Sequence, residues 1–388
     1  MNQLAHRLCR GAVLAIPLAL LAASTAQGAD TIVVGLRPGA VVATALSASG
    51  AVQVGAVPKL RAIVVHLPAT RRSAALRALR RSRAVRYAEP QRRLRALETP
   101  QPDPGRAQQW GLDAVGIGGA WLVTRGAGVV VAVVDTGVSL APDLAGRLLP
   151  GWNVIDGSDP PADDNGHGTH VAGTIAEVEG NGLAEAGVAP EASILPVKVL
   201  DAEGTGSDAD VAAGIVWAAD HGARVVNLSL GGGESSTVLA DAVVYARHRD
   251  VLIVAAAGND GGSVGFPARL TGVLAVGAVD VALVRAPFSA GGRSLDLVAP
   301  GVGILQQTLD EAGGYADRSF SGTSMATPHV AGVAALALAA GRATTAAGVA
   351  RLLTRTALDL GPAGKDTGYG AGLVRADAAV GAPALPVP

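Results

Sequence analysis

The chain has 388 residues, of which 49% are hydrophobic, 16% charged and only 3% aromatic, and its formal net charge is −1. This length excludes a single ordinary domain core, and the presence of only one cysteine excludes an internal disulfide. The near-neutral total hides an uneven distribution. Residues 1–100 hold 15 Lys and Arg against 3 Asp and Glu, whereas the remaining residues hold 16 against 29.

The first 28 residues have the pattern of a secretory signal peptide. Arg7 and Arg10 give a positive start, the apolar stretch over 13–22 is too short to span a bilayer, and the small residues at 24–28 suit cleavage. The only cysteine, Cys9, lies inside this segment and would leave with it. We therefore expect an exported protein, extracellular or periplasmic, with no membrane attachment after signal removal.

A basic segment follows, and we expect it to form a small α+β domain over residues 29–97. Strand-like runs occupy 31–34, 62–67 and 85–90, and a helical pattern covers 72–83. Ten arginines fall between Arg71 and Arg95. On the residues alone, this segment is either a solvated basic face or a surface for nucleic acid.

Prolines alternate with other residues over 98–107, which predicts an extended, accessible linker. From 108 to 375 strands and helices alternate, as in a three-layer α/β fold with a mostly parallel sheet. The strand-like runs are 129–134, 194–199, 225–228, 251–256 and 273–279, and the helical ones are 208–221 and 237–249. Residues 376–388 are rich in Ala and Pro, and we expect a loosely ordered tail there.

Three polar residues occupy positions that suit nucleophilic catalysis. Asp135 directly follows the apolar run 129–134, and the carboxyl ends of parallel strands are where α/β sites are built. His167 lies where a polar glycine turn opens a small-residue helix. Ser324 begins an Ala/Val/Leu-rich helix expected over 324–340, where free N–H groups favour an oxyanion. A serine needs a base and a group that orients the base, so the three residues predict a catalytic triad.

These residues stand, in this order, in three long motifs: Val-Val-Asp135-Thr-Gly, His167-Gly-Thr-His-Val-Ala-Gly and Gly-Thr-Ser324-Met-Ala-Thr-Pro-His-Val-Ala-Gly. Over residues 108–374 the chain therefore resembles the subtilisin-like serine peptidases. The resemblance implies that Ser324 attacks a peptide carbonyl, that His167 takes its proton and that Asp135 orients the imidazole. Asn259, in Ala-Ala-Ala-Gly-Asn259-Asp, resembles the oxyanion-hole residue of the family.

The resemblance also implies two extended segments that pair with the substrate backbone, and a pocket for P1, the residue before the cut. The segments are Ser229, Leu230, Gly231 and Gly232, and Gly204, Thr205 and Gly206, while the pocket residues are Ala256, Ala257, Gly258 and Gly265. Small pocket residues suggest a preference for large apolar P1 side chains. Backbone pairing gives affinity without reading sequence, so we expect broad specificity.

A structural calcium ion is a further implication of the resemblance. The family's tight site combines a carboxylate, an amide side chain and loop carbonyls, which are the hard oxygen ligands that calcium prefers. The implied ligands here are Asp143, Val178, Asn181 and Leu183. The loop is longer than the family's common form, and an ordinary acidic surface loop is the alternative.

Two further histidines in the motifs, His170 and His329, lie on the helical side, where we expect packed, hydrogen-bonded structural residues. His167 and His170 are three residues apart and could share a zinc ion. No glutamate base and no third-ligand pattern accompany them, so we do not expect zinc.

We therefore expect a secreted, monomeric serine endopeptidase that acts on polypeptides. The basic domain resembles the family's inhibitory propeptide, so its partner would be the acidic catalytic domain and not nucleic acid. Self-processing would cut the precursor between Arg95 and Gln108. A serine esterase or lipase is disfavoured by the triad order and by the absence of a Gly-x-Ser-x-Gly motif. A binding module that kept the fold without catalysis is the third possibility.

Overall fold

The computed structural model describes residues 31–47, 49–67, 72–91, 101–157, 160–232 and 234–383. The expected signal peptide, residues 1–28, lies outside the described residues. The chain divides into two compact units, Met1–Glu98 and Thr99–Pro388, and we describe each by itself. Among the residues that the structure describes, no helix is both long and apolar enough to cross a membrane.

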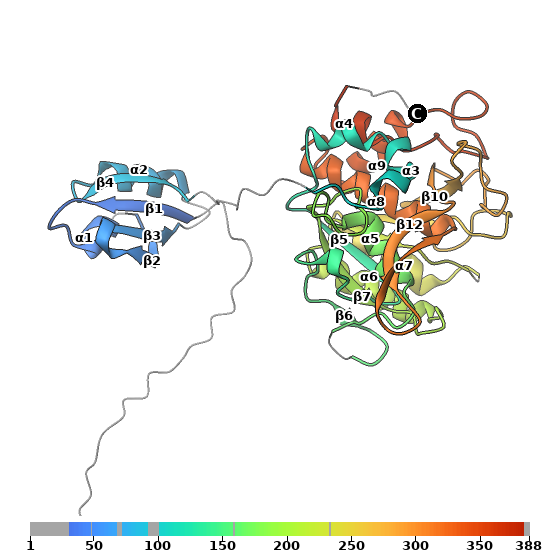
Figure 1. Cartoon of the computed structure of the whole chain (residues 1–388), viewed down its shortest axis with the longest axis horizontal. Coiled ribbons are helices and arrows are strands. Elements are labelled where there is room, and N and C mark those ends of the chain that lie inside the picture. The colour runs from blue at the N-terminus through green and yellow to red at the C-terminus, as the bar shows by residue number, and fades with distance from the viewer. Residues whose placement is uncertain are drawn as a thin grey trace, which may run out of the picture. The chain divides into compact units, whose positions relative to one another are not determined.

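The first unit is a four-stranded antiparallel sheet with two helices (Figure 1). Its strand order is β2-β3-β1-β4, and Ile32, Val34, Val65 and Leu79 are fully or almost fully buried in its core. Strand β2 was not predicted, because its side chains are mostly exposed and give no apolar alternation. The elements are β1 Thr31–Leu36, α1 Val42–Leu46, β2 Val52–Val57, η1 Pro58–Leu60, β3 Ala62–His66, α2 Arg72–Arg81 and β4 Val85–Pro90.

The second unit is built on a seven-stranded sheet with the order β11-β10-β9-β8-β5-β7-β6, and its strand pairings are parallel. The prediction of a mostly parallel α/β sheet is thus confirmed. The strands are β5 Val130–Asp135, β6 Trp152–Asn153, β7 Ser193–Lys198, β8 Val225–Leu228, β9 Leu252–Ala256, β10 Val273–Val279 and β11 Leu297–Pro300. Two of these strands, β6 and β11, were not recognised in the sequence.

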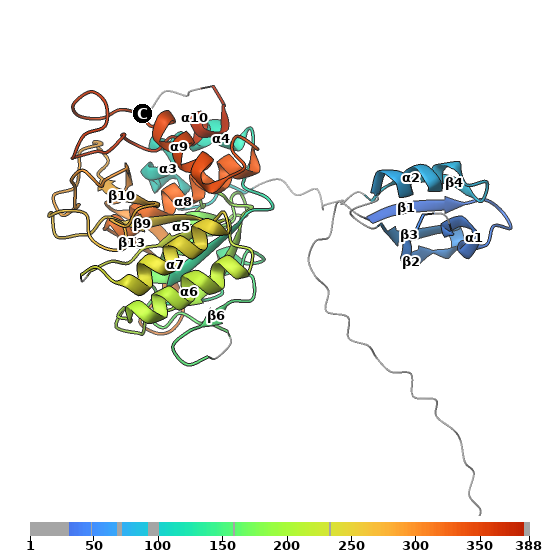
Figure 2. The same cartoon turned by 180° about the vertical axis from the view of Figure 1, so that it is seen from behind.

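Helices cover both faces of this sheet, and the alternation of strand side chains explains why. Val131 and Val133 of β5 point into one hydrophobic cluster with helices α5 His167–Ala176 and α8 Thr323–Ala339. Ala132 and Val134 point into the other cluster, with α6 Asp208–Asp220 and α7 Thr237–His248. Figure 2 shows α6 and α7 side by side across the sheet. A strand buried on both faces needs a continuous apolar run, which is the pattern that β5 has.

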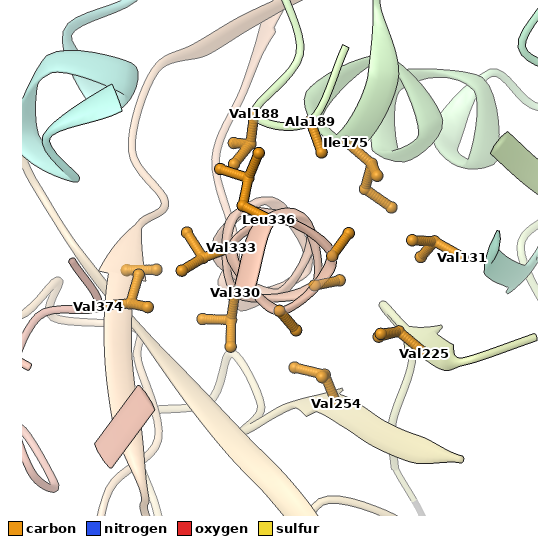
Figure 3. Close-up of a cluster of buried hydrophobic side chains, with 14 of the residues drawn as sticks. Val131, Ile175, Val188, Ala189, Val225, Val254, Val330, Val333, Leu336 and Val374 are labelled. Atoms are coloured by element: carbon orange, nitrogen blue, oxygen red, sulfur yellow. The ribbon is translucent and has the colours of Figure 1, made fainter. Parts of the chain in front are cut away.

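Helix α8 runs through the first of these clusters and is apolar on every side. Val330, Val333 and Leu336 project from it, and Val131, Val225 and Val254 approach it from the sheet (Figure 3). Its many small residues allow close packing: a Cβ added at Gly332 would lie 2.6 Å from Cβ of Val188. A helix that is hydrophobic all round is buried, so α8 is a core helix that fixes the position of Ser324 near its start.

The remaining elements surround this core. They are η3 Arg106–Gln108, α3 Trp110–Ala114, α4 Ile117–Trp121, η4 Pro142–Leu144, β12 Ile304–Leu309, β13 Tyr315–Phe320, α9 Ala346–Thr356 and α10 Ala376–Val380. The expectation of a loosely ordered tail over residues 376–388 is wrong for the first residues of that segment. Asp377 is fully buried and pairs with Arg375, while Ala376, Ala379 and Val380 pack into the core as helix α10.

The expected accessible linker, 98–107, also needs correction. Residues 98–100 lie outside the described residues, but 101–107 are attached to the second unit. The carboxylate of Asp103 is buried and accepts hydrogen bonds from the amides of Gly180, Asn181 and Gly182 at 2.8–3.1 Å. Gly105 N donates to the carbonyl of Ala184 at 2.8 Å. The Asp103 carboxylate and its hydrogen bonds to the loop amides hold this segment in place. The proline content of the segment does not predict these contacts.

Candidate active site

Asp135 and His167 are brought together by the end of β5 and the start of α5. Asp135 is fully buried at the carboxyl end of its strand, and its Oδ1 lies 2.7 Å from Nδ1 of His167. The same oxygen accepts a hydrogen bond from the amide of Thr136 at 2.8 Å, which fixes the carboxylate. The bond to Nδ1 leaves Nε2 of His167 as the nitrogen that can accept a proton.

The electrostatic setting of His167 favours a stronger base. Burial opposes the charged imidazolium, but the Asp135 carboxylate, through its charge and its hydrogen bond, and the charge of Asp163 outweigh it, so the pKa of His167 is raised. The side chain remains 27% exposed, so a substrate can reach it. A base with a raised pKa and an accessible edge is suited to take a proton from a hydroxyl.

Asp163 was not predicted as a site residue, yet it organises the loop before His167. Its Oδ1 accepts from Thr136 Oγ1 at 2.8 Å and from the amide of Gly166 at 2.9 Å. Its Oδ2 accepts from the amide and the hydroxyl of Thr169 at 2.9 and 2.6 Å. Asp163 therefore ties the residue after Asp135 to the first turn of α5. In the sequence, only its position four residues before His167 indicated that Asp163 could belong to the site.

Ser324 is the second residue of α8 and faces Ser229. Its hydroxyl donates to the carbonyl oxygen of Ser229 at 3.0 Å, and the Ser229 hydroxyl donates to the Ser324 carbonyl at 2.7 Å. The N-cap residue Gly322 has no side chain to cap the first turn. Ser324 therefore stands at an open helix N-terminus, where partial positive charge gathers.

Asn259 lies beside this helix start with its amide in a defined orientation. Its Oδ1 accepts from the amide and the hydroxyl of Thr323 at 2.8 and 2.9 Å, which directs Nδ2 elsewhere. A Cβ added at Gly322 would lie 3.3 Å from Asn259 Nδ2 and 3.6 Å from Ser324 N. Asn259 Nδ2 and the Ser324 amide nitrogen thus both lie near one point beside Gly322.

His167, Asn259 and Ser324 line one cleft with a volume of about 1230 Å³. The expected substrate residues that share this lining are Gly204, Thr205, Gly206, Ser229, Leu230, Gly231, Gly232, Ala256 and Gly258. Ala257 and Gly265 do not line it. The side chain of Ala257 is buried in the core, and its carbonyl accepts from the amide of Gly265 at 2.9 Å. Phe266 and Pro267 line the cleft instead.

The two other motif histidines are structural, as expected. Nε2 of His170 lies 3.0 Å from the carbonyl oxygen of Ile304 and 3.1 Å from that of Arg318, and Nδ1 of His329 lies 2.9 Å from the Met325 carbonyl. Burial lowers the pKa of each histidine to about 4. Nε2 of His170 thus serves these two carbonyls, while its Nδ1 is buried and has no hydrogen-bond partner in the described part of the chain.

The implied calcium ligands lie around one loop, and their chemistry suits a hard cation. Asp143 is fully buried, its Oδ1 accepts from Asn181 Nδ2 at 2.6 Å, and its Oδ2 has no hydrogen-bond partner. Burial raises the pKa of Asp143 to about 6. Within the described ranges no group of three or more His, Cys, Asp or Glu side chains is arranged to hold a metal. A site here would thus depend on Asp143, Asn181 and carbonyl oxygens, a set that fits calcium.

Comparisons with known proteins agree with this geometry. A sequence profile described as the Subtilase family matches residues 126–372, more than half of the chain. A profile described as the Fervidolysin N-terminal prodomain matches residues 24–91. A solved protease from Pseudoalteromonas arctica superposes with a TM-score of 0.68 at 35% identity, covering 73% of this chain and 99% of that one.

Curated relatives are similar over the second unit. Subtilisin Savinase of Lederbergia lenta is 47% identical over 255 residues, which cover 66% of this chain and 91% of that protein. Thermitase of Thermoactinomyces vulgaris is 44% identical over 249 residues, covering 64% and 88%. Alkaline elastase YaB of Bacillus sp. strain YaB is 48% identical over 255 residues, but the match spans only 65% of its length.

Proposed function

The chain belongs to the subtilase family, and from this premise we propose that it is a serine endopeptidase that acts through Asp135, His167 and Ser324. The observation that carries the proposal is that His167, paired with Asp135, lines the same cleft as Ser324, with Asn259 Nδ2 and the Ser324 amide nitrogen both near Gly322. That arrangement combines a nucleophile, a base, an orienting carboxylate and an oxyanion site.

The mechanism begins when a peptide carbonyl enters the cleft. The Ser324 hydroxyl leaves the Ser229 carbonyl, gives its proton to Nε2 of His167 and attacks the carbonyl carbon. The Asp135 carboxylate stabilises the imidazolium and keeps Nδ1–H toward Oδ1. His167 then donates the proton to the leaving amine, and an acyl-enzyme forms on Ser324. Water, activated by the same imidazole, releases the acid and restores the hydroxyl.

Negative charge develops on the former carbonyl oxygen in both halves of the reaction. We assign its stabilisation to Asn259 Nδ2 and the Ser324 amide, which both lie near Gly322. Thr323 holds Asn259 Oδ1 from both its amide and its hydroxyl, so the donor is fixed before the substrate arrives. Donors that need no reorganisation are the most effective ones.

Substrate recognition rests mainly on backbone groups in this proposal. The Gly204–Gly206 and Ser229–Gly232 segments form the two walls, and both are rich in glycine, so a peptide can pair with them as an added strand. Ala256 and Gly258 leave room for a large apolar P1 side chain, with Phe266 at the same cleft. Specificity would be broad, because paired backbones read no sequence.

The biological form would be a self-processed, secreted precursor. The first unit, which matches the prodomain profile, would act as inhibitor and folding aid, and its solvated arginines suit docking to an acidic partner. Calcium would be held by Asp143, Asn181 and the carbonyls of Val178 and Leu183, where it would neutralise the buried carboxylate. Because the ion would bind the native state and not the unfolded chain, it would stabilise the fold, which has no disulfide.

A serine-directed fluorophosphonate tests the proposed function. The processed protein should be labelled once, on the peptide that contains Ser324, and the Ser324→Ala variant should not be labelled. Cleavage of casein should be lost in parallel. Labelling without peptide-bond cleavage would favour an esterase, and a folded protein that resists labelling would favour a binding module.

A further inference from the structure

The charged residues that line the catalytic cleft are of one sign. Apart from His167, they are Glu203, Asp208 and Glu234, and neither lysine nor arginine is among the described lining residues. All three carboxylates are exposed within a site that a peptide must enter. A cleft lined by one sign of charge concentrates ligands of the opposite sign.

The three carboxylates flank the two walls that would pair with the substrate. Glu203 precedes Gly204–Gly206, Asp208 follows it as the first residue of α6, and Glu234 follows Ser229–Gly232. Asp208 is also held in position, because its Oδ2 accepts from Oγ of Ser236, the N-cap residue of α7, at 2.5 Å. Both walls therefore present negative charge beside the path of the substrate backbone.

The sequence of the chain supplies an independent indication. Arg92, Arg93 and Arg95 precede the segment in which maturation cleavage is proposed. If the enzyme cuts its own precursor there, these arginines lie on the N-terminal side of its first substrate. A negatively charged cleft and an arginine-rich natural cut site are chemically complementary.

We propose that Glu203, Asp208 and Glu234 determine specificity, so that the cleft selects peptides with lysine or arginine among P2 to P5, the residues that precede P1. This inference rests on the proposed endopeptidase function. A preference for apolar P1 side chains is compatible with a preference for basic side chains at P2 to P5, because different parts of the cleft contact them. Each exposed charge pair contributes a gain in kcat/KM of roughly 2- to 5-fold, since solvent screens it.

Fluorogenic peptides test this inference directly. A neutral scaffold with Leu at P1 carries arginine, its uncharged analogue citrulline or glutamate at one of the positions P2 to P5. We expect kcat/KM to fall from arginine to citrulline to glutamate at one position or more. Raising the salt from about 0.1 M to about 1 M shortens the screening length from roughly 10 Å to 3 Å and should reduce the ratio.

Variants identify the residues responsible. Glu203→Gln, Asp208→Asn and Glu234→Gln should each reduce kcat/KM more for the arginine peptide than for the citrulline peptide, and so lower their ratio at the position that the carboxylate serves. Asp210→Asn is the matched control: it is in the same first turn of α6 and loses the same charge, but it does not line the cleft.

Equal cleavage of arginine and citrulline peptides at all four positions would overturn the inference and leave the proposed function standing. A ratio that survives removal of all three carboxylates would also overturn it. Failure of the processed enzyme to cleave any of the peptides would instead contradict the endopeptidase function, and this inference with it.

Discussion

The hydroxyl of Thr136 donates to the carboxylate of Asp163 at 2.8 Å. The same Oγ1 accepts from the amide of Gly168 at 2.9 Å, so the residue after Asp135 is joined to the residue after His167. Lys198 braces the other side of this junction, because its Nζ donates to the Thr136 carbonyl at 2.8 Å and to Asp164 at 2.6 Å. The distance within the Asp135–His167 pair therefore depends also on Asp163 and Lys198, which do not line the cleft.

Asp163→Asn should impair catalysis by changing His167. Loss of the Asp163 charge lowers the pKa of the imidazolium, which Asp135 and Asp163 together raise. The acidic limb of the kcat/KM profile should therefore move to lower pH, and the plateau should fall by roughly tenfold as the pair loses its fixed geometry. Asp164→Asn removes the neighbouring charge, which is not among those that raise the pKa of His167, so the acidic limb should move less than in Asp163→Asn. An unchanged acidic limb in Asp163→Asn would refute this role.

Asn259→Ala should reduce turnover and leave binding nearly unchanged, because the amide acts on the oxyanion and not on the ground-state carbonyl. Subtilisin loses roughly 10²- to 10³-fold in turnover when its oxyanion-hole asparagine is removed, and we expect a loss of that size. Steady-state kinetics on one peptide separate kcat from KM. Turnover at the wild-type level would exclude Asn259 from the site.

The buried acids near the loop 178–185 predict a pH-dependent stability. Burial raises the pKa of Glu185 to about 8, and neither of its oxygens has a hydrogen-bond partner. A carboxyl whose folded pKa exceeds the unfolded value of 4.5 stabilises the native state below that value, and the stability is lost as the pH rises toward 8. In chelator, Tm should therefore fall over this range.

Thermal unfolding checks this in the Ser324→Ala background, which prevents autolysis. Glu185→Gln should flatten the fall in Tm between about pH 4.5 and pH 8, because it removes the ionisation. Calcium should raise Tm most at the alkaline end, where the carboxylates are charged. A Tm that chelator leaves untouched at every pH would argue against the calcium site.

The attachment of 101–107 to the second unit narrows the position of the maturation cut. Asp103 binds three loop amides, so a cut after it would remove a buried carboxylate from its partners. We expect the first residue of the processed protein to lie between Ala96 and Gln101, and N-terminal sequencing identifies it. A mature chain that begins after Asp103 and keeps full stability would contradict this.

The sequence predicted the parts of the fold whose signal is local. The strand that ends in Asp135 is a continuous apolar run, and the helix that begins near Ser324 is uniformly small and apolar. It did not reveal Asp103, because a carboxylate that caps distant amides leaves no periodicity. Ala256, the last residue of β9, and Ala257, the residue after it, are both alanines, and only the structure shows that the first lines the cleft and the second lies in the core.

Strands β12 and β13 pair as an antiparallel hairpin, and the sequence did not predict them for a related reason. Side chains of β13 alternate between exposed and half-buried, and those of β12 between buried and half-buried, while residues such as Gln306 and Thr308 supply the inward face. Apolar alternation is the usual indicator of a strand, and polar residues that face inward conceal it. The hairpin nevertheless contributes to the site indirectly, because Phe320 stacks on His170 at 4.5 Å in the helix that carries His167.

The most direct test of the central claim is the intact mass of the secreted protein, with the wild type beside Ser324→Ala. If Ser324 is the nucleophile, the wild type should lose the first unit at the cut, and the variant should remain joined through residues 92–100. Adding a trace of active wild type to the variant should show whether its cut site is accessible. Equal processing of both proteins expressed alone would mean that another protease matures the chain, and would contradict self-processing by Ser324.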